Sequence, residues 1–118
     1  YEVKMKDRYE NLKEKIGKNF EEIKSLAISQ NIMEEARLEM NLKIIQAVVM
    51  RYIRIVLFQK KGIILCTSVK EIMEYVSTGF LRYFSKSEDR KFALERVRRV
   101  ELILTEIEKL NEELRVAS

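Results

Sequence analysis

A chain of 118 residues is long enough for one domain. It has no proline and only three glycines, so the residues that favour turns are too few for a fold with many turns. Because 47% of its residues are hydrophobic and 36% are charged, it is too apolar to be disordered, and its composition favours helices. The formal net charge of +4 is compatible with nucleic-acid binding but does not require it. We therefore expect a single helical domain over residues 1–118.

The first expected helix runs from about Val3 to Leu26, where apolar side chains recur at alternating steps of four and three and so form one stripe. Asn19 is the one polar residue in this stripe. It either fixes the register of a helix–helix contact or lies at a solvated edge. The pattern breaks after this helix, and Ser29 or Asn31 is expected to cap the next one.

The second expected helix runs from about residue 32 to residue 60, and from Ile44 onwards it is apolar nearly all round. A helix that is apolar on every side must be surrounded, which places it in the middle of a bundle or at a subunit interface. Ile53 is accordingly expected to be fully buried, and Gly62 is expected to end the helix at its C′ position. The candidate interface residues are Ile45, Val49, Arg51, Tyr52, Arg54 and Val56.

A third helix is predicted to begin after Ser68, because Ser68 followed by Glu71 has the spacing of a capping box, and to continue to Tyr83. Ser85 or Ser87 is expected to cap a fourth helix. Four helices, two of them long, joined by short connections, predict an all-α bundle with a buried central helix.

Several kinds of chemistry are excluded by the residues that the chain lacks. Without histidine it has neither the usual general base nor the commonest metal ligand, and Cys66 alone cannot complete a zinc site or a disulfide. A lone cysteine favours a reducing, cytoplasmic compartment, and Cys66 is interpreted as a small buried hydrophobe rather than a reactive thiol. We expect no catalytic activity, no cofactor, no metal and no small-molecule substrate, and the most apolar stretch is too short to cross a membrane.

Two groups of basic residues are candidates for binding a partner. Arg51 and Arg54 lie three apart on an otherwise apolar helix. They either form a solvated stripe paired with acids such as Glu71 or Glu74, or they lie at a protein interface, where arginine is enriched.

The second group contains the candidate nucleic-acid-binding residues, Lys86, Arg90, Lys91, Arg96 and Arg99. Phosphate contact needs several bases on one surface, and Arg96 and Arg99 share a helix face. Because acidic residues are interleaved with them, an ordinary solvated face is the alternative interpretation.

The segment from Leu38 to Lys61, LEMNLKIIQAVVMRYIRIVLFQKK, resembles the long central helix of GINS subunits, the helical adaptors of the archaeal and eukaryotic replicative helicase. In that family an apolar helix ends in a basic stretch, here Arg51, Arg54, Lys60 and Lys61. A charged helix before it, over 3–26, and a helical pair after it, over 69–115, are similar to the family's A domain. The small β-rich B domain that GINS subunits commonly carry has no counterpart in the sequence.

The sequence therefore predicts a non-enzymatic helical scaffold or adaptor that assembles through apolar helix faces, with itself or with a protein partner. The reason is that the second and fourth expected helices carry more apolar surface than a four-helix bundle of this size hides. The GINS resemblance implies a DNA-replication complex as the partner. The alternative is a protein that binds nucleic acid through residues 86–99, and a viral or plasmid-borne helical protein is not distinguished from the first hypothesis.

Overall fold

The computed structural model describes residues 2–59, 61–65 and 67–117, so Lys60 and Cys66 lie outside the described residues. Its elements are α1 (Glu2–Ser29), α2 (Glu35–Leu57), α3 (Val69–Phe80), the short 3₁₀ helix η1 (Leu81–Tyr83) and α4 (Ser87–Ala117). No strand occurs in the described ranges. The predicted all-α bundle of four helices is confirmed.

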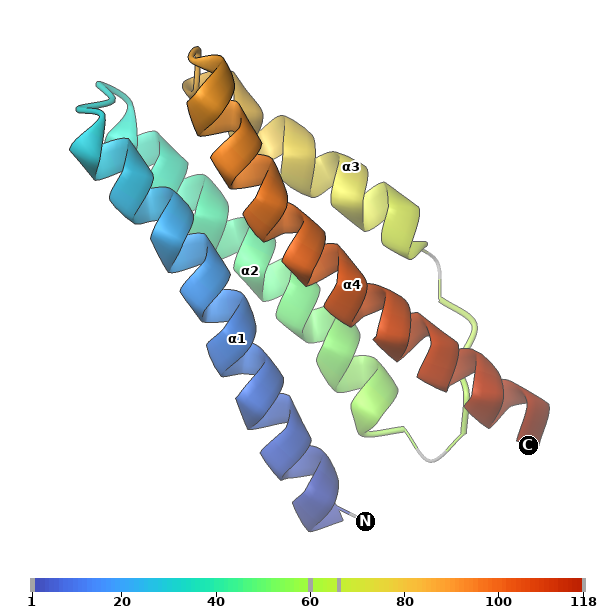
Figure 1. Cartoon of the computed structure of the whole chain (residues 1–118). Helices are drawn as coiled ribbons and strands as arrows, with labels where there is room; N and C mark the ends of the chain where they lie inside the picture. The colour runs from blue at the N-terminus through green and yellow to red at the C-terminus, as the bar shows by residue number, and fades with distance from the viewer. Residues whose placement is uncertain (1, 60, 66, 118) are drawn as a thin grey trace.

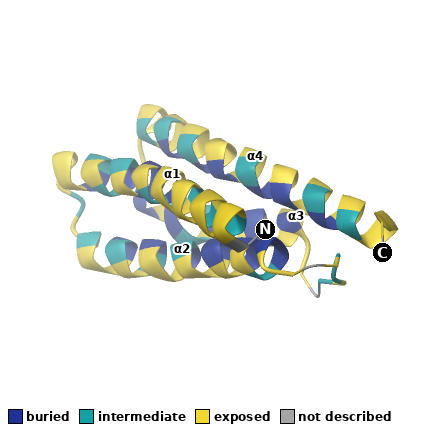
Figure 2. Cartoon of the chain, turned by 90° about the horizontal axis from the view of Figure 1, so that it is seen from below, coloured by how far each residue is buried: buried dark blue, intermediate teal, exposed yellow. Residues whose placement is uncertain are grey.

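The four α-helices pack side by side, and α3 is much shorter than the other three (Figure 1). Helices α2 and α4 each contact the other three helices, whereas α1 and α3 lie on opposite sides of that pair. The buried residues lie on the sides of the helices that face one another (Figure 2). Ile53 is fully buried in this core, as predicted.

The turn between α1 and α2 differs from the prediction. Asn31 has a φ of 52°, and the amides of Asn31 and Ile32 donate to carbonyl groups of the last turn of α1, which is the Schellman arrangement. Asparagine tolerates this left-handed conformation better than most residues. Asn31 therefore ends α1 rather than capping α2, and Ser29 bonds back within α1. The N-cap position of α2 falls on Glu34, whose side chain makes no capping hydrogen bond.

The start of α3 agrees with the prediction. The Oγ of Ser68 accepts a hydrogen bond from the amide of Glu71 at 3.2 Å, which satisfies one of the free N–H groups of the first turn. The helix ends at Phe80 and continues as the 3₁₀ turn η1 up to Tyr83.

Gly62 is not the C′ residue of α2, because α2 ends at Leu57 and Gly62 lies further along the connector to α3. The connector is instead held by α4. The Nδ2 of Asn111 donates to the carbonyl of Ile63 at 2.8 Å, and its Oδ1 accepts from the amide of Ile63 at 2.9 Å. A Cβ on Gly62 would overlap backbone atoms of Asn111 and Arg115. Glycine is required there by the close approach of the connector to α4.

Candidate functional site

Four of the six predicted interface residues lie inside the protein's own core. Ile45, Val49, Tyr52 and Val56 are all buried, so in this fold they pack against the other helices and cannot contact a partner. Burial also raises the pKa of the Tyr52 phenol to about 12. The predicted interface is therefore wrong for these four residues. The prediction failed because an all-round apolar helix gives no signal of which face its neighbours cover.

The opposite side of α2 is open to solvent. We call the exposed residues Met40, Ile44, Val48, Arg51 and Arg54 the α2 outer face. Residues four or three apart on a helix lie one above the other, so the first four of these follow one line along α2 and Arg54 lies at its edge. The exposed fractions are 64% for Met40, 47% for Ile44 and 37% for Val48. The expected central helix is thus covered on one side only.

Helix α3 borders this face and adds an aromatic side chain, Tyr75, which is 48% exposed. The two helices approach closely at Gly79, where an added Cβ would lie 2.8 Å from the Cδ1 of Ile45. At the same crossing the Nδ2 of Asn41 donates to the carbonyl of Gly79 at 3.0 Å and to the Oη of Tyr83 at 3.1 Å. A shallow hollow between the helices is lined by Asn41, Ile45, Tyr75, Thr78, Gly79 and Arg82.

The charge of the α2 outer face is entirely positive. No acidic residue occurs between Glu39 and Glu71 in the sequence. Glu39 is directed to the α1 side, where its Oε1 lies 3.1 Å from the Nζ of Lys24. This hydrogen bond lowers the pKa of Glu39 and raises that of Lys24. Glu39 also pairs with Lys43 on its own helix, at 3.6 Å.

Arg51 and Arg54, the remaining two predicted interface residues, are both exposed. Neither side chain forms an ion pair or hydrogen bond with any residue in the described ranges, so the expected pairs with Glu71 or Glu74 are not formed there. No described carboxylate therefore balances the charges of these two arginines, which lie at the end of an exposed apolar line.

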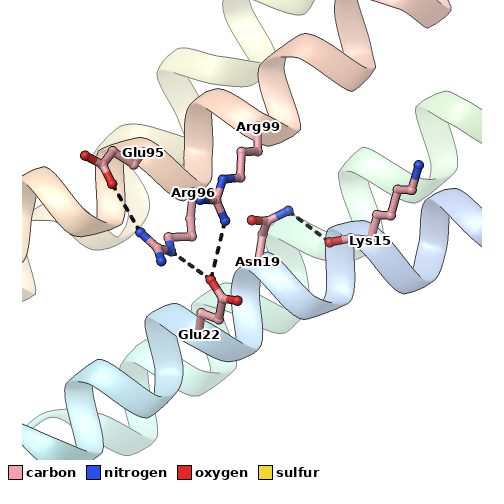
Figure 3. A network of polar contacts seen from close by, with 6 residues as sticks. All are labelled: Lys15, Asn19, Glu22, Glu95, Arg96 and Arg99. Atoms are coloured by element: carbon pink, nitrogen blue, oxygen red, sulfur yellow. Dashed lines mark hydrogen bonds and ion pairs between the residues drawn. The ribbon is translucent and has the colours of Figure 1, made fainter.

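The arginines of α4 are in a different situation (Figure 3). The Nε of Arg96 donates to Glu22 of α1 at 2.8 Å, and the Nη1 of Arg99 lies 3.7 Å from the same carboxylate oxygen. Arg96 also contacts Glu95 at 3.3 Å, and its guanidinium carbon lies 3.5 Å from the ring centre of Phe92. The Arg96 side chain is only 15% exposed. The two contacts with Glu22 join α4 to α1.

The contact with Arg96 changes the pKa of Glu22. The hydrogen bond from Arg96 is the largest influence on its carboxylate and holds the pKa of Glu22 below the ordinary value. On the same helix Asn19 is buried and donates to the carbonyl of Lys15 at 2.9 Å (Figure 3). Asn19 is therefore not at a solvated edge, and the hydrogen bond that its amide donates stays within its own helix.

The structure divides the predicted nucleic-acid-binding residues into two sets. Lys86, Arg90 and Lys91 are exposed at the start of α4, and Lys86 donates to the side chain of Gln30 at 3.2 Å. Arg96 and Arg99 are bound to Glu22 further along. The five residues therefore do not form one surface of free cations.

A hollow of about 690 Å³ is an open groove between α3 and α4, lined by Val69, Lys70, Met73, Glu74, Ser77, Thr78, Glu101, Thr105 and Glu108. Within the described ranges, no three acidic or cysteine side chains are grouped so that they could hold a metal ion. Among the described helices, none combines the length and the apolar character needed to span a bilayer.

Comparisons with protein-family models, with curated proteins and with solved structures find no match to this chain. The site must therefore be interpreted from its own geometry. Sequence reasoning found Arg51 and Arg54 but missed Met40, Ile44, Val48 and Tyr75. The spacing of four that joins Met40, Ile44 and Val48 is visible in the sequence, but the buried line through Ile45, Val49 and Ile53 has the same spacing. Only the packing of α1, α3 and α4 distinguishes the two lines.

Proposed function

We propose that this chain is a non-enzymatic, cytoplasmic helical adaptor that binds a protein partner through the α2 outer face. The observation that carries the proposal is an unbroken exposed line of Met40, Ile44 and Val48 next to Arg51 and Arg54, which lack acidic partners in the described part of the chain. Isolated exposed apolar residues are ordinary, whereas a line of them along one helix is typical of an interaction surface. Methionine, tyrosine and arginine are also the residues that protein interfaces favour.

The nucleic-acid alternative has less support from the contacts. Binding to nucleic acid is driven by basic side chains that neutralise phosphates and so release the counterions bound there, and Arg96 and Arg99 are already paired with Glu22. The resemblance of residues 38–61 to the central helix of GINS subunits makes a DNA-replication complex the setting in which we would first look for the partner.

The test is site-specific photocrosslinking in cells or extracts of the native source. A photoreactive amino acid placed at Ile44 or at Val48 should yield the same discrete crosslinked protein. The matched control is Leu102, which is exposed on α4 and lies away from the α2 outer face. Absence of a crosslink at Ile44 and Val48, or the same products from Leu102, would show that this face does not bind a partner.

A further inference from the structure

We infer that the partner segment is an amphipathic helix of another protein, with an apolar stripe flanked by aspartate and glutamate residues. This inference rests on the proposed function and specifies the chemistry of the partner. It is carried by the shape of the α2 outer face and by the sign of its charge.

The shape of the surface fits a helix. From Met40 to Arg54 the α2 outer face extends for about four turns, or roughly 20 Å. Exposed side chains four apart form a ridge, and such a ridge packs into the groove of a second helix. The hollow beside Gly79, between α2 and α3, lies along this ridge and is bordered by Tyr75. A partner helix resting on the ridge would cover both Tyr75 and the hollow.

The charge of the surface requires acidic residues on the partner. Arg51 and Arg54 have no carboxylate partner among the described residues, and no acidic residue of α2 follows Glu39. Covering them with an apolar or basic segment would remove water from two guanidinium groups without replacing its hydrogen bonds, which costs free energy. A carboxylate supplies the bidentate hydrogen bonds that match a guanidinium. The acidic residues of the partner must therefore lie near the C-terminal end of α2.

The same charge disfavours a second copy of this chain. In a two-fold dimer of antiparallel α2 helices centred on Ile44, Arg54 faces Glu34, but Arg51 faces Arg37, seven positions on the other side of the centre. Like charges at such an interface are repulsive. A different, acidic protein can supply carboxylates to both arginines, whereas a second copy in this register leaves Arg51 facing a like charge.

The experiment measures binding of labelled synthetic helical peptides by fluorescence anisotropy. The first peptide carries leucine at alternating steps of four and three, flanked by glutamate. Matched peptides carry glutamine or lysine in place of the glutamate. We expect the glutamate peptide to bind about tenfold or more tightly than the glutamine peptide, and the lysine peptide to bind weakest, with added salt reducing the difference. Comparable affinity for the three peptides overturns the inference.

Protein variants locate the binding site. Arg51→Glu combined with Arg54→Glu should weaken binding of the glutamate peptide by about tenfold or more. The matched control is Arg98→Glu, an exposed arginine of α4, which should leave the affinity unchanged. Loss of binding in the control equal to that in the double variant contradicts the inference. Because the peptide comparison uses the unchanged protein, it decides the question even if a variant folds poorly.

Three further measurements separate this inference from other occupants. Sedimentation of the protein alone should show a monomer, and vesicles of anionic phospholipid and short duplex DNA should bind no better in the parent than in the double variant. Dimerisation, vesicle binding or DNA binding that depends on Arg51 and Arg54 overturns the inference. If crosslinks at Ile44 persist while the glutamate peptide fails to bind, the adaptor function stands and only the partner chemistry is wrong.

Discussion

Two arginine pairs with the same spacing, Arg51 and Arg54 on α2 and Arg96 and Arg99 on α4, occupy opposite situations in this protein. The α4 pair reaches across to Glu22 on α1, and Arg96 is mostly covered. The α2 pair is exposed and finds no carboxylate in the described part of the chain. Their sequence contexts suggest the reverse, because the α2 pair lies in a long apolar stretch and the α4 pair lies among other charges.

What separates the two pairs is a residue distant in sequence. Glu22 lies 74 positions before Arg96, and the packing of α1 against α4 brings it within 2.8 Å. No carboxylate of a described neighbouring helix pairs with Arg51 or Arg54, and Glu39 of α2 itself pairs with Lys24 of α1. Whether a pair of charged residues on a helix forms an ion pair within the fold or stays exposed thus depends on which side chain the neighbouring helix places beside it.

The largest expected effect tests the assumption that α2 has one covered face and one open face. Ile53 is fully buried on the covered face. Ile53→Ala should lower the free energy of unfolding by about 2–5 kcal/mol through lost burial and the cavity left behind. Ile53→Asp should prevent folding, because an unpaired charge would be buried. Chemical denaturation measures both, with Lys13→Ala as a surface control expected within about 0.5 kcal/mol. A parent-like Ile53→Ala protein would remove the distinction between the two faces.

A smaller loss of stability is expected when Arg96 of the α4 pair is replaced. Arg96→Ala removes the guanidinium from the ring of Phe92 together with a mostly covered side-chain stem. We expect it to destabilise the protein by about 1 kcal/mol, the size of such a stacked contact and its packing. Denaturation curves should show the change in midpoint, and equal midpoints for Arg96→Ala and Arg51→Ala would contradict the difference between the pairs.

The contribution of the α4 pair to stability should depend on pH, because its partner Glu22 is a titratable group. The pKa of Glu22 is lowered in the folded protein, so its ionised form favours folding above the ordinary pKa of about 4.5. That contribution is lost as the pH falls through the lowered value. Parent and Glu22→Gln proteins should therefore differ in stability near neutral pH and converge in acid. Because Glu39 titrates in the same direction, the difference between the two proteins is the informative quantity.

The smallest effect is expected for the α2 pair itself. Arg51→Ala and Arg54→Ala remove exposed side chains that form no ion pair with any described residue, so each should change the free energy of unfolding by less than about 0.5 kcal/mol. Thermal or chemical denaturation of the protein alone is the measurement. A loss above 1 kcal/mol would mean that these arginines serve the fold, and the proposed interface would lose its charged part.

Local signals in the sequence predicted much of the fold. The Ser68–Glu71 spacing located the start of α3, and the apolar pattern placed Ile53 in the core, because both depend on residues within a few turns. Features that depend on distant residues were missed. Gly62 looked like a helix stop, but its role is set by Asn111 of α4.

The candidate site was predicted only in part, for the same reason. Arg51 and Arg54 were identified because charges in an apolar helix are conspicuous. Ile45 and Ile44 are adjacent and chemically alike, yet one is buried and the other exposed. Which of them faces solvent is decided by where α1, α3 and α4 pack, and that information is absent from the pattern within α2.

The hydrogen bonds between Asn111 and Ile63 affect how readily the connector separates from α4. The amide of Ile63 lies in an irregular segment, where hydrogen exchange is ordinarily fast, but it donates to a buried side chain of α4. Exchange at Ile63 therefore requires the connector to separate from the C-terminal half of α4. We therefore expect slow exchange at this loop amide, which would report on the contact between the connector and a helix that begins more than twenty residues later.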